Sequence, residues 1–85
     1  MTKGVPPPQL SGNAPQTGEV YKHYKGDSYR VVGMALHSPD DSWNVVYEPL
    51  YDGAVSKLFS RPLIEWFEMV EWEGRKVQRF SRITL

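Results

Sequence analysis

The sequence predicts a mainly β protein: a small β-barrel of five to six short strands with one short helical or 3₁₀ segment. Short runs in which apolar and polar residues alternate recur at close spacing, as in a half-buried sheet. Turn-forming residues separate these runs, as in Lys25-Gly26-Asp27 and Glu73-Gly74. The three Trp, five Tyr and three Phe residues all lie at or after Tyr21, so they can share one core.

The chain divides into a Pro-rich N-terminal segment and a single domain. Residues 1–17 contain four of the seven prolines and few large apolar side chains. Such a segment cannot bury enough surface to offset its ordering entropy, so we expect a disordered tail. Residues 18–85 are expected to form the domain, because a chain of 85 residues leaves no room for a second one.

The first half of the domain reads as three strands. Val20–Tyr24 is the first, and Ser28–His37 is the clearest, because apolar residues occur on both of its alternating faces. Gly33 within that strand indicates a bulge or a close backbone approach. Trp43–Tyr51 is the third, and its pairing is expected to end at Pro49, because proline has no N–H for a ladder.

The second half contains the one ambiguous stretch. After a short expected strand at Lys57–Ser60, apolar residues recur at helical spacing within Pro62–Val70. We expect a short helical or 3₁₀ segment there that runs into a strand near Met69–Trp72. The chain then turns and returns in a last strand at Lys76–Phe80.

Composition excludes several classes of function. Ten basic and ten acidic residues balance, which argues against non-specific attraction to nucleic acid or an acidic membrane. The absence of cysteine excludes disulfides, thiolate metal sites and a cysteine nucleophile. No apolar run approaches the ~18–20 residues of a membrane helix, and the N-terminus lacks the apolar region of a signal peptide. A cytoplasmic protein with no membrane partner is the expectation.

The best functional signal is the run Tyr21-Lys22-His23-Tyr24-Lys25, in which aromatic and basic side chains interleave. Rings can stack on bases, while lysine and arginine neutralise an anion. Three tyrosines are predicted as stacking surfaces, three cations as anion ligands, and one histidine as a hydrogen-bonding group. These residues are Tyr24, Tyr47 and Tyr51; Lys25, Arg61 and Arg79; and His23. The alternative is structural: Tyr21, Tyr29 and Tyr47 are core residues, and the two arginines pair with nearby glutamates.

No catalytic residue, metal or cofactor is predicted. His23 and His37 lack the spacing of a metal motif and read as structural histidines. The serines lie in turns or at strand ends, and none lies in a nucleophile elbow. The glutamates at 65, 68, 71 and 73 have the spacing of a solvated face rather than of a buried acid–base pair.

Several motifs occur together in a familiar order. They are Gly18 to Gly26, with its Y-x-H-Y-K-G pattern; Tyr29-Arg30-Val31; Ala35 to Ser38; Val45-Val46-Tyr47; Leu50-Tyr51; Arg61-Pro62; Phe67; and Arg79-Phe80. Over about residues 18–83 the chain resembles a bacterial family known as domain of unknown function 1653. The resemblance implies an SH3-like small β-barrel and implies no activity.

These observations predict a non-catalytic binding module with a shallow aromatic and basic groove. The expected ligand is a nucleotide or single-stranded nucleic acid, with a protein partner as the next candidate. One alternative is a protein–protein interaction domain that docks or self-associates through a sheet edge near Pro49 and Lys57–Ser60. The last alternative is a small hydrolase that uses His23.

Overall fold

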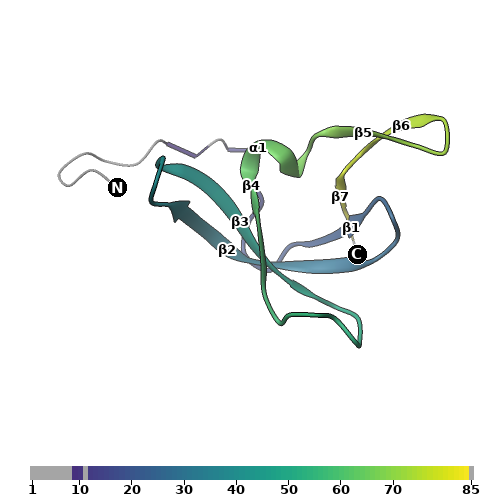
Figure 1. The fold of residues 1–85 in the computed structure, drawn as a ribbon, viewed down its shortest axis with the longest axis horizontal. Coiled ribbons are helices and arrows are strands. Elements are labelled where there is room, and N and C mark those ends of the chain that lie inside the picture. Colours follow the sequence, from purple (N-terminus) through teal and green to yellow (C-terminus); the bar gives the residue numbers. More distant parts are fainter. Residues whose placement is uncertain (1–8, 11, 85) are drawn as a thin grey trace.

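A five-stranded antiparallel sheet forms the body of the computed structural model, which describes residues 9–10 and 12–84. Strands β1 to β4 lie side by side, and the last strand, β7, returns to pair with β1 (Figure 1). A separate hairpin, β5–β6, extends between α1 and β7. The elements are β1 (Val20–His23), β2 (Ser28–His37), β3 (Ser42–Pro49), β4 (Phe59–Pro62), α1 (Leu63–Trp66), β5 (Met69–Trp72), β6 (Arg75–Gln78) and β7 (Phe80–Arg82).

A β-bulge interrupts the pairing of β2 with β3. Val31 lies opposite Tyr47, but the next partner, Val46, lies opposite Gly33, so Val32 is the extra residue. This confirms the bulge that the glycine predicted. A bulge bends a strand and increases its twist. Both long strands curve accordingly, and the sheet becomes concave on the side that faces α1 and the hairpin (Figure 1).

The core is largely aromatic. Its buried residues are Tyr21, Val31, Val45, Tyr47, Trp66 and Phe80. The rings of Trp66 and Phe80 stack with centroids 3.8 Å apart and an interplanar angle of 5°. Four residues are too few to form a helix by themselves. The short α1 therefore depends on Trp66, which is fully buried against the sheet.

The later elements confirm one prediction and revise another. A helical turn followed by a strand at Met69–Trp72 is present, with Glu73 and Gly74 in the turn at φ values of 52° and 78°. The expected last strand at Lys76–Phe80 is instead two strands. Residues 75–78 pair with β5 and residues 80–82 pair with β1, so the partner changes at Arg79.

Two strand boundaries also differ from the sequence prediction. β3 ends at Pro49, so Tyr51 lies in the bend beyond it and does not continue the strand face that holds Tyr47. β4 begins at Phe59 and ends at Pro62, two residues later than expected, because its register is set by pairing with β3.

The fold is mostly β with one short helix, as predicted, but among the described strands no ladder joins β4 to β7 or the hairpin to the main sheet. The sheets are therefore not closed into a barrel by hydrogen bonds.

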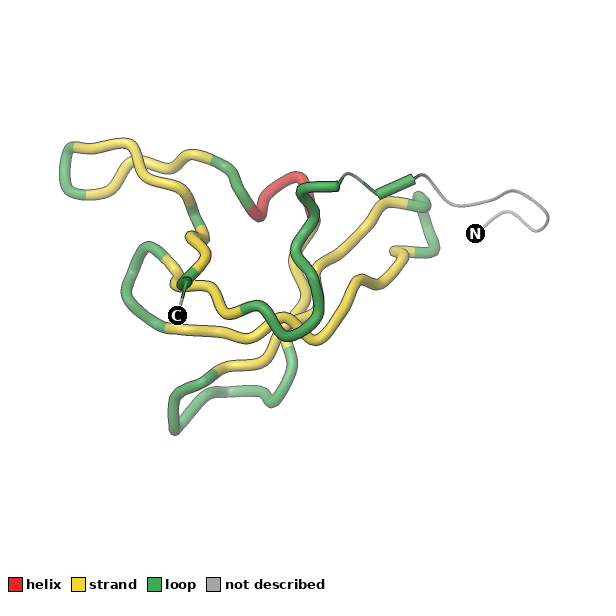
Figure 2. Tube along the Cα trace, turned by 180° about the vertical axis from the view of Figure 1, so that it is seen from behind, coloured by secondary structure: helices red, strands yellow, loops and turns green. Residues whose placement is uncertain are grey.

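The segment before β1 runs as a loop from beside α1 to the sheet (Figure 2). Pro15 is buried, and the Thr17 hydroxyl donates to the Val32 carbonyl oxygen at 3.2 Å. Most of the predicted disordered tail falls on residues 1–8 and 11, which lie outside the described residues. Within residues 9–10 and 12–84, no helix has the length and apolar character needed to cross a membrane.

Candidate functional site

His23, at the end of β1, is held in one orientation by its own turn. The Lys25 backbone N–H donates to the His23 Nδ1 atom at 3.2 Å. Because Nδ1 accepts this bond, the proton of the neutral ring lies on Nε2, which is then a hydrogen-bond donor. The imidazole also lies edge-on to Phe80, with ring centroids 5.0 Å apart, and 4.4 Å from the Tyr24 ring.

The surroundings of His23 favour its neutral form. Burial lowers its pKa most, and the charges of Arg61, Arg79 and Lys25 lower it further, against a smaller opposing effect of Asp27. The three cations are therefore close enough to act on one imidazole, although they come from separate parts of the chain. We call His23, Lys25, Arg61 and Arg79 the His23 cluster.

The two arginines of the His23 cluster are partly engaged by glutamates. Arg61 donates from Nη1 to Glu65 at 3.0 Å, and Arg79 donates from Nη2 to Glu68 at 2.6 Å. The predicted alternative, arginine–glutamate pairing, is thus present. Yet the Nε atoms of both arginines are buried and have no hydrogen-bond partner among the described residues. Each guanidinium keeps donor capacity that its glutamate does not use.

Phe80 is the point around which the His23 cluster assembles. The Arg61 guanidinium carbon lies 5.9 Å from the Phe80 ring centroid, a cation–π distance. Arg79 precedes Phe80 in the chain, and its carbonyl oxygen accepts a bond from the Tyr24 N–H at 3.0 Å. The Phe80 side chain is itself 1% exposed, so it supports the side chains of the cluster and offers no surface to a ligand.

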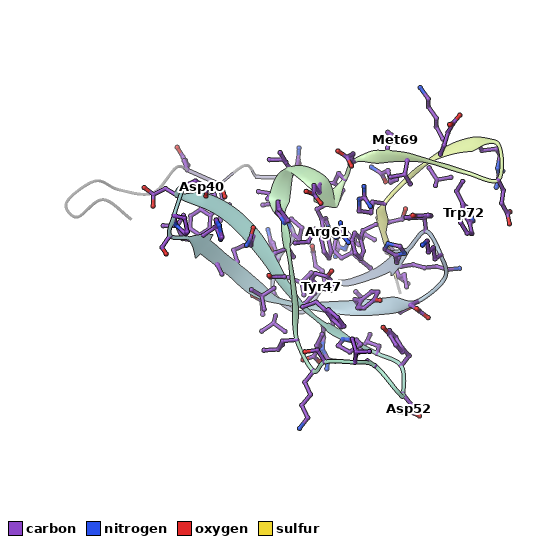
Figure 3. The ribbon with its side chains drawn as sticks, viewed as in Figure 1. Asp40, Tyr47, Asp52, Arg61, Met69 and Trp72 are labelled. Atoms are coloured by element: carbon purple, nitrogen blue, oxygen red, sulfur yellow. The ribbon has the colours of Figure 1, made fainter. Side chains whose placement is uncertain are left out.

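A cleft lies beside the cluster, between β1 and the β5–β6 hairpin. Its volume is about 280 Å³. Tyr24 and Trp72 contact each other edge-to-face at its wall, with ring centroids 5.3 Å apart, and the Lys25 ammonium lies 5.8 Å from the Tyr24 ring centroid. Trp72 points from the hairpin toward the β1–β2 turn (Figure 3) and is 38% exposed. The cleft, which we call the Tyr24 cleft, is lined by Lys22, His23, Tyr24, Trp72, Glu73, Arg75, Val77, Gln78 and Ser81.

The structure brings five of the seven predicted site residues together and places two elsewhere. His23 and Tyr24 line the Tyr24 cleft, and the Lys25 ammonium lies at the Tyr24 ring. Arg61 contacts Phe80, and the charges of Arg61 and Arg79 act on His23, but neither arginine lines the cleft.

Tyr47 and Tyr51 do not line this cleft. Tyr47 is 6% exposed and packs edge-on against Trp66 and Phe80 in the core. Tyr51 is half-exposed in the bend after β3, where its hydroxyl lies 3.2 Å from that of Tyr29. Neither ring is placed to stack on a ligand that occupies the cleft.

Trp72 and Arg75 line the cleft but were not predicted to belong to it. The one sequence feature that pointed toward these residues was the expected strand at Met69–Trp72 with a turn after it. It did not indicate that Trp72 of the hairpin contacts Tyr24.

His37 lies at the far end of β2 from β1, away from His23. The two histidines therefore cannot share a ligand.

The observations so far define a small, mostly β domain with a cationic cluster next to an aromatic cleft. The chain belongs to the family described as "Protein of unknown function (DUF1653)", whose model matches residues 19–82. It is similar to the crystal structure of a protein belonging to DUF1653 from Bordetella bronchiseptica. The identity is 33%, the TM-score is 0.75, and the match covers 88% of this chain and 92% of that one. No protein with a curated description matches this sequence.

Proposed function

We propose that this domain is a non-catalytic binding module for a nucleotide or single-stranded nucleic acid. The observation that supports it is the Tyr24 cleft, where Tyr24 and Trp72 meet beside His23 and the Lys25 ammonium lies at the Tyr24 ring. A half-exposed aromatic pair can stack a base, and stacking contributes on the order of 1–3 kcal/mol per base. The adjacent cations can neutralise the phosphate that accompanies the base.

The state of His23 favours binding over hydrolysis. A general base needs a free lone pair within reach of its substrate. In His23 the Nδ1 lone pair is occupied by the Lys25 N–H, and the neutral ring has its proton on Nε2. The imidazole can thus donate a hydrogen bond to an acceptor on a ligand, which is the role that we assign to it.

The proposal is tested by the quenching of tryptophan fluorescence with a short oligothymidylate at several salt concentrations. Three cations in contact with phosphates predict a slope of log K against log salt of about −2. Lys25→Ala should make that slope shallower by about 0.7. Lys57→Ala, which removes an exposed lysine from the β3–β4 loop, is the matched control and should leave it unchanged. Absence of quenching, or binding that does not respond to salt, would contradict the proposal.

A second candidate is docking through the edge of the sheet. β4 is a terminal strand of the five-stranded sheet, and the loop before it exposes Val55 and Leu58, which are 96% and 52% accessible. Exposed strand edges beside apolar side chains are common sites of strand addition. This candidate predicts a mass by light scattering that rises with concentration and that Leu58→Lys lowers. A constant monomer mass would leave no support for self-association.

We also propose that the architecture is an SH3-like barrel with an inserted hairpin, and that the protein works in the cytoplasm. Four consecutive antiparallel strands, with the last strand beside the first, support the fold assignment. The bulge in β2 supports it too, since bulges curve small barrels. The lack of cysteine agrees with a reducing compartment.

A further inference from the structure

Three hydrogen-bond donors approach the region around Phe80 from three separate elements. Arg61 comes from β4, Arg79 from the link between β6 and β7, and His23 from the end of β1. Arg61 and His23 contact the Phe80 ring, and the charge of Arg79, the residue before Phe80, acts on His23. An anionic group of a ligand bound near Phe80 would therefore meet hydrogen-bond donors from several directions.

Both arginines keep a buried Nε donor that has no partner among the described residues. Arg61 meets Glu65 through Nη1, so the Nε–Nη2 edge of its guanidinium is not used by that glutamate. This edge is a fork suited to bidentate contact with carboxylate or phosphate. Arg79 likewise has a buried Nε without a partner among the described residues, and the neutral His23 ring presents Nε2–H. Buried donors of this kind are uncommon in folded proteins unless a ligand or water completes them.

The number and arrangement of these donor groups favour one type of anion over others. A carboxylate presents two oxygens in one plane, and an internal phosphodiester also has two free oxygens, with chain on both sides. A phosphate monoester presents three terminal oxygens in a pyramid. Three donors from three elements therefore match a terminal phosphate better than they match the other two groups. The guanidiniums are recessed, with side chains 28% and 19% exposed, which suits the end of a ligand rather than the middle of a strand.

We infer that the His23 cluster binds the terminal phosphate monoester of a nucleotide or of a 5′-phosphorylated single strand, with the adjoining base in the Tyr24 cleft. The inference rests on the proposed function and adds the identity of the anionic group. Glu65 pairs with Nη1 of Arg61 and Glu68 with Nη2 of Arg79, and the two carboxylates offset the charges of the two arginines. The charges that face the site also include Lys25 and Asp27, which act on His23 from its own turn.

Matched ligands separate this inference from the proposed function. The same short oligothymidylate is titrated with a 5′-phosphate and with a 5′-hydroxyl, and thymidine 5′-monophosphate is compared with thymidine. We expect the phosphorylated member of each pair to bind about tenfold more tightly or better, because hydrogen bonds between charged groups are added. Binding of thymidine 5′-monophosphate identifies a mononucleotide site, whereas binding of the 5′-phosphorylated strand alone identifies a strand-end site. Equal binding of both forms of the strand would overturn this inference and leave the proposed function standing. No binding of any of the four would overturn both.

A charge-preserving variant tests the unused Nε–H donor of Arg79. Arg79→Lys retains the positive charge but loses the Nε–H, so it should reduce the preference for the 5′-phosphate. Arg82→Lys, at an exposed arginine that pairs with Glu19, is the matched control and should retain it. Should Arg79→Lys not fold, the Nε–H resonances of Arg61 and Arg79 in the wild-type protein give the answer. Both should shift on addition of thymidine 5′-monophosphate, and resonances that stay in place under saturating ligand would overturn the inference.

Discussion

The Tyr24 cleft and the β3–β4 loop both present aromatic and charged side chains, but they are built differently. The loop encloses the larger hollow, about 690 Å³, yet its lining comes from one continuous stretch between Glu48 and Lys57. The cleft is smaller, about 280 Å³, and its lining comes from β1, β5, β6 and β7. Beside it lie two buried Nε donors without partners among the described residues. Convergence of distant segments and unused donors, rather than volume, distinguish the cleft as the candidate site.

The largest expected effect is on the free energy of unfolding, because the side chains that hold the two regions in place differ in burial. Trp66 is fully buried and stacks on Phe80, which positions the His23 cluster. Trp66→Ala should lower the free energy of unfolding by about 3–5 kcal/mol, measured by urea denaturation. Tyr51→Ala, in the half-exposed bend, should cost about 1 kcal/mol or less. Similar losses for both variants would show that the loop is as tightly integrated as the cleft.

A smaller effect, on affinity, sharpens the comparison. Trp72→Leu removes the ring that faces Tyr24 across the cleft, so it should weaken binding of oligothymidylate by about 5- to 150-fold. Tyr51→Leu makes the same kind of change at the loop and should leave the affinity unchanged. The measurement is a fluorescence anisotropy titration with a labelled strand. A greater loss from Tyr51→Leu would move the site to the loop.

The smallest effect concerns pH. Burial and the neighbouring cations lower the pKa of His23 in the folded protein, so the unfolded chain binds the proton more readily. Unfolding is therefore favoured as the pH falls below about 6.5, the ordinary histidine value, and His23 contributes no pH dependence well above it. His23→Gln should flatten this part of the stability profile, measured by urea denaturation at a series of pH values. A profile that the His23 change leaves intact would show that His23 titrates normally.

Local patterns in the sequence predicted the elements whose structure is decided by residues close together in the chain. Alternation located β2 at Ser28–His37, and Gly33 located its bulge. The helical spacing and the Glu73-Gly74 turn located α1, β5 and the start of the hairpin. Three of the seven candidate site residues, His23, Tyr24 and Lys25, lie together because they belong to one short strand and turn. Arg61 and Arg79 come from β4 and from the link between β6 and β7, so no local pattern brings them near His23.

The remaining features depend on tertiary pairing that the sequence does not reveal. The exchange of partners at Arg79 arises because β6 pairs with β5 while β7 pairs with β1. That exchange returns the chain from the hairpin to β1, and Trp72 of the hairpin contacts Tyr24. Tyr47 could not be distinguished from a surface ring by alternation, because an inward strand face and a groove wall have the same period. Its burial was decided by α1, which places Trp66 against it.

The central claim is that the Tyr24 cleft and the His23 cluster form one ligand site. A ¹H–¹⁵N chemical-shift titration of the labelled domain with a short oligothymidylate tests this most directly. We predict shifts that cluster on the amides of His23, Tyr24 and Lys25 and on the Trp72 indole N–H. Shifts confined to the loop between Glu48 and Lys57, or no shifts at millimolar ligand, would contradict it.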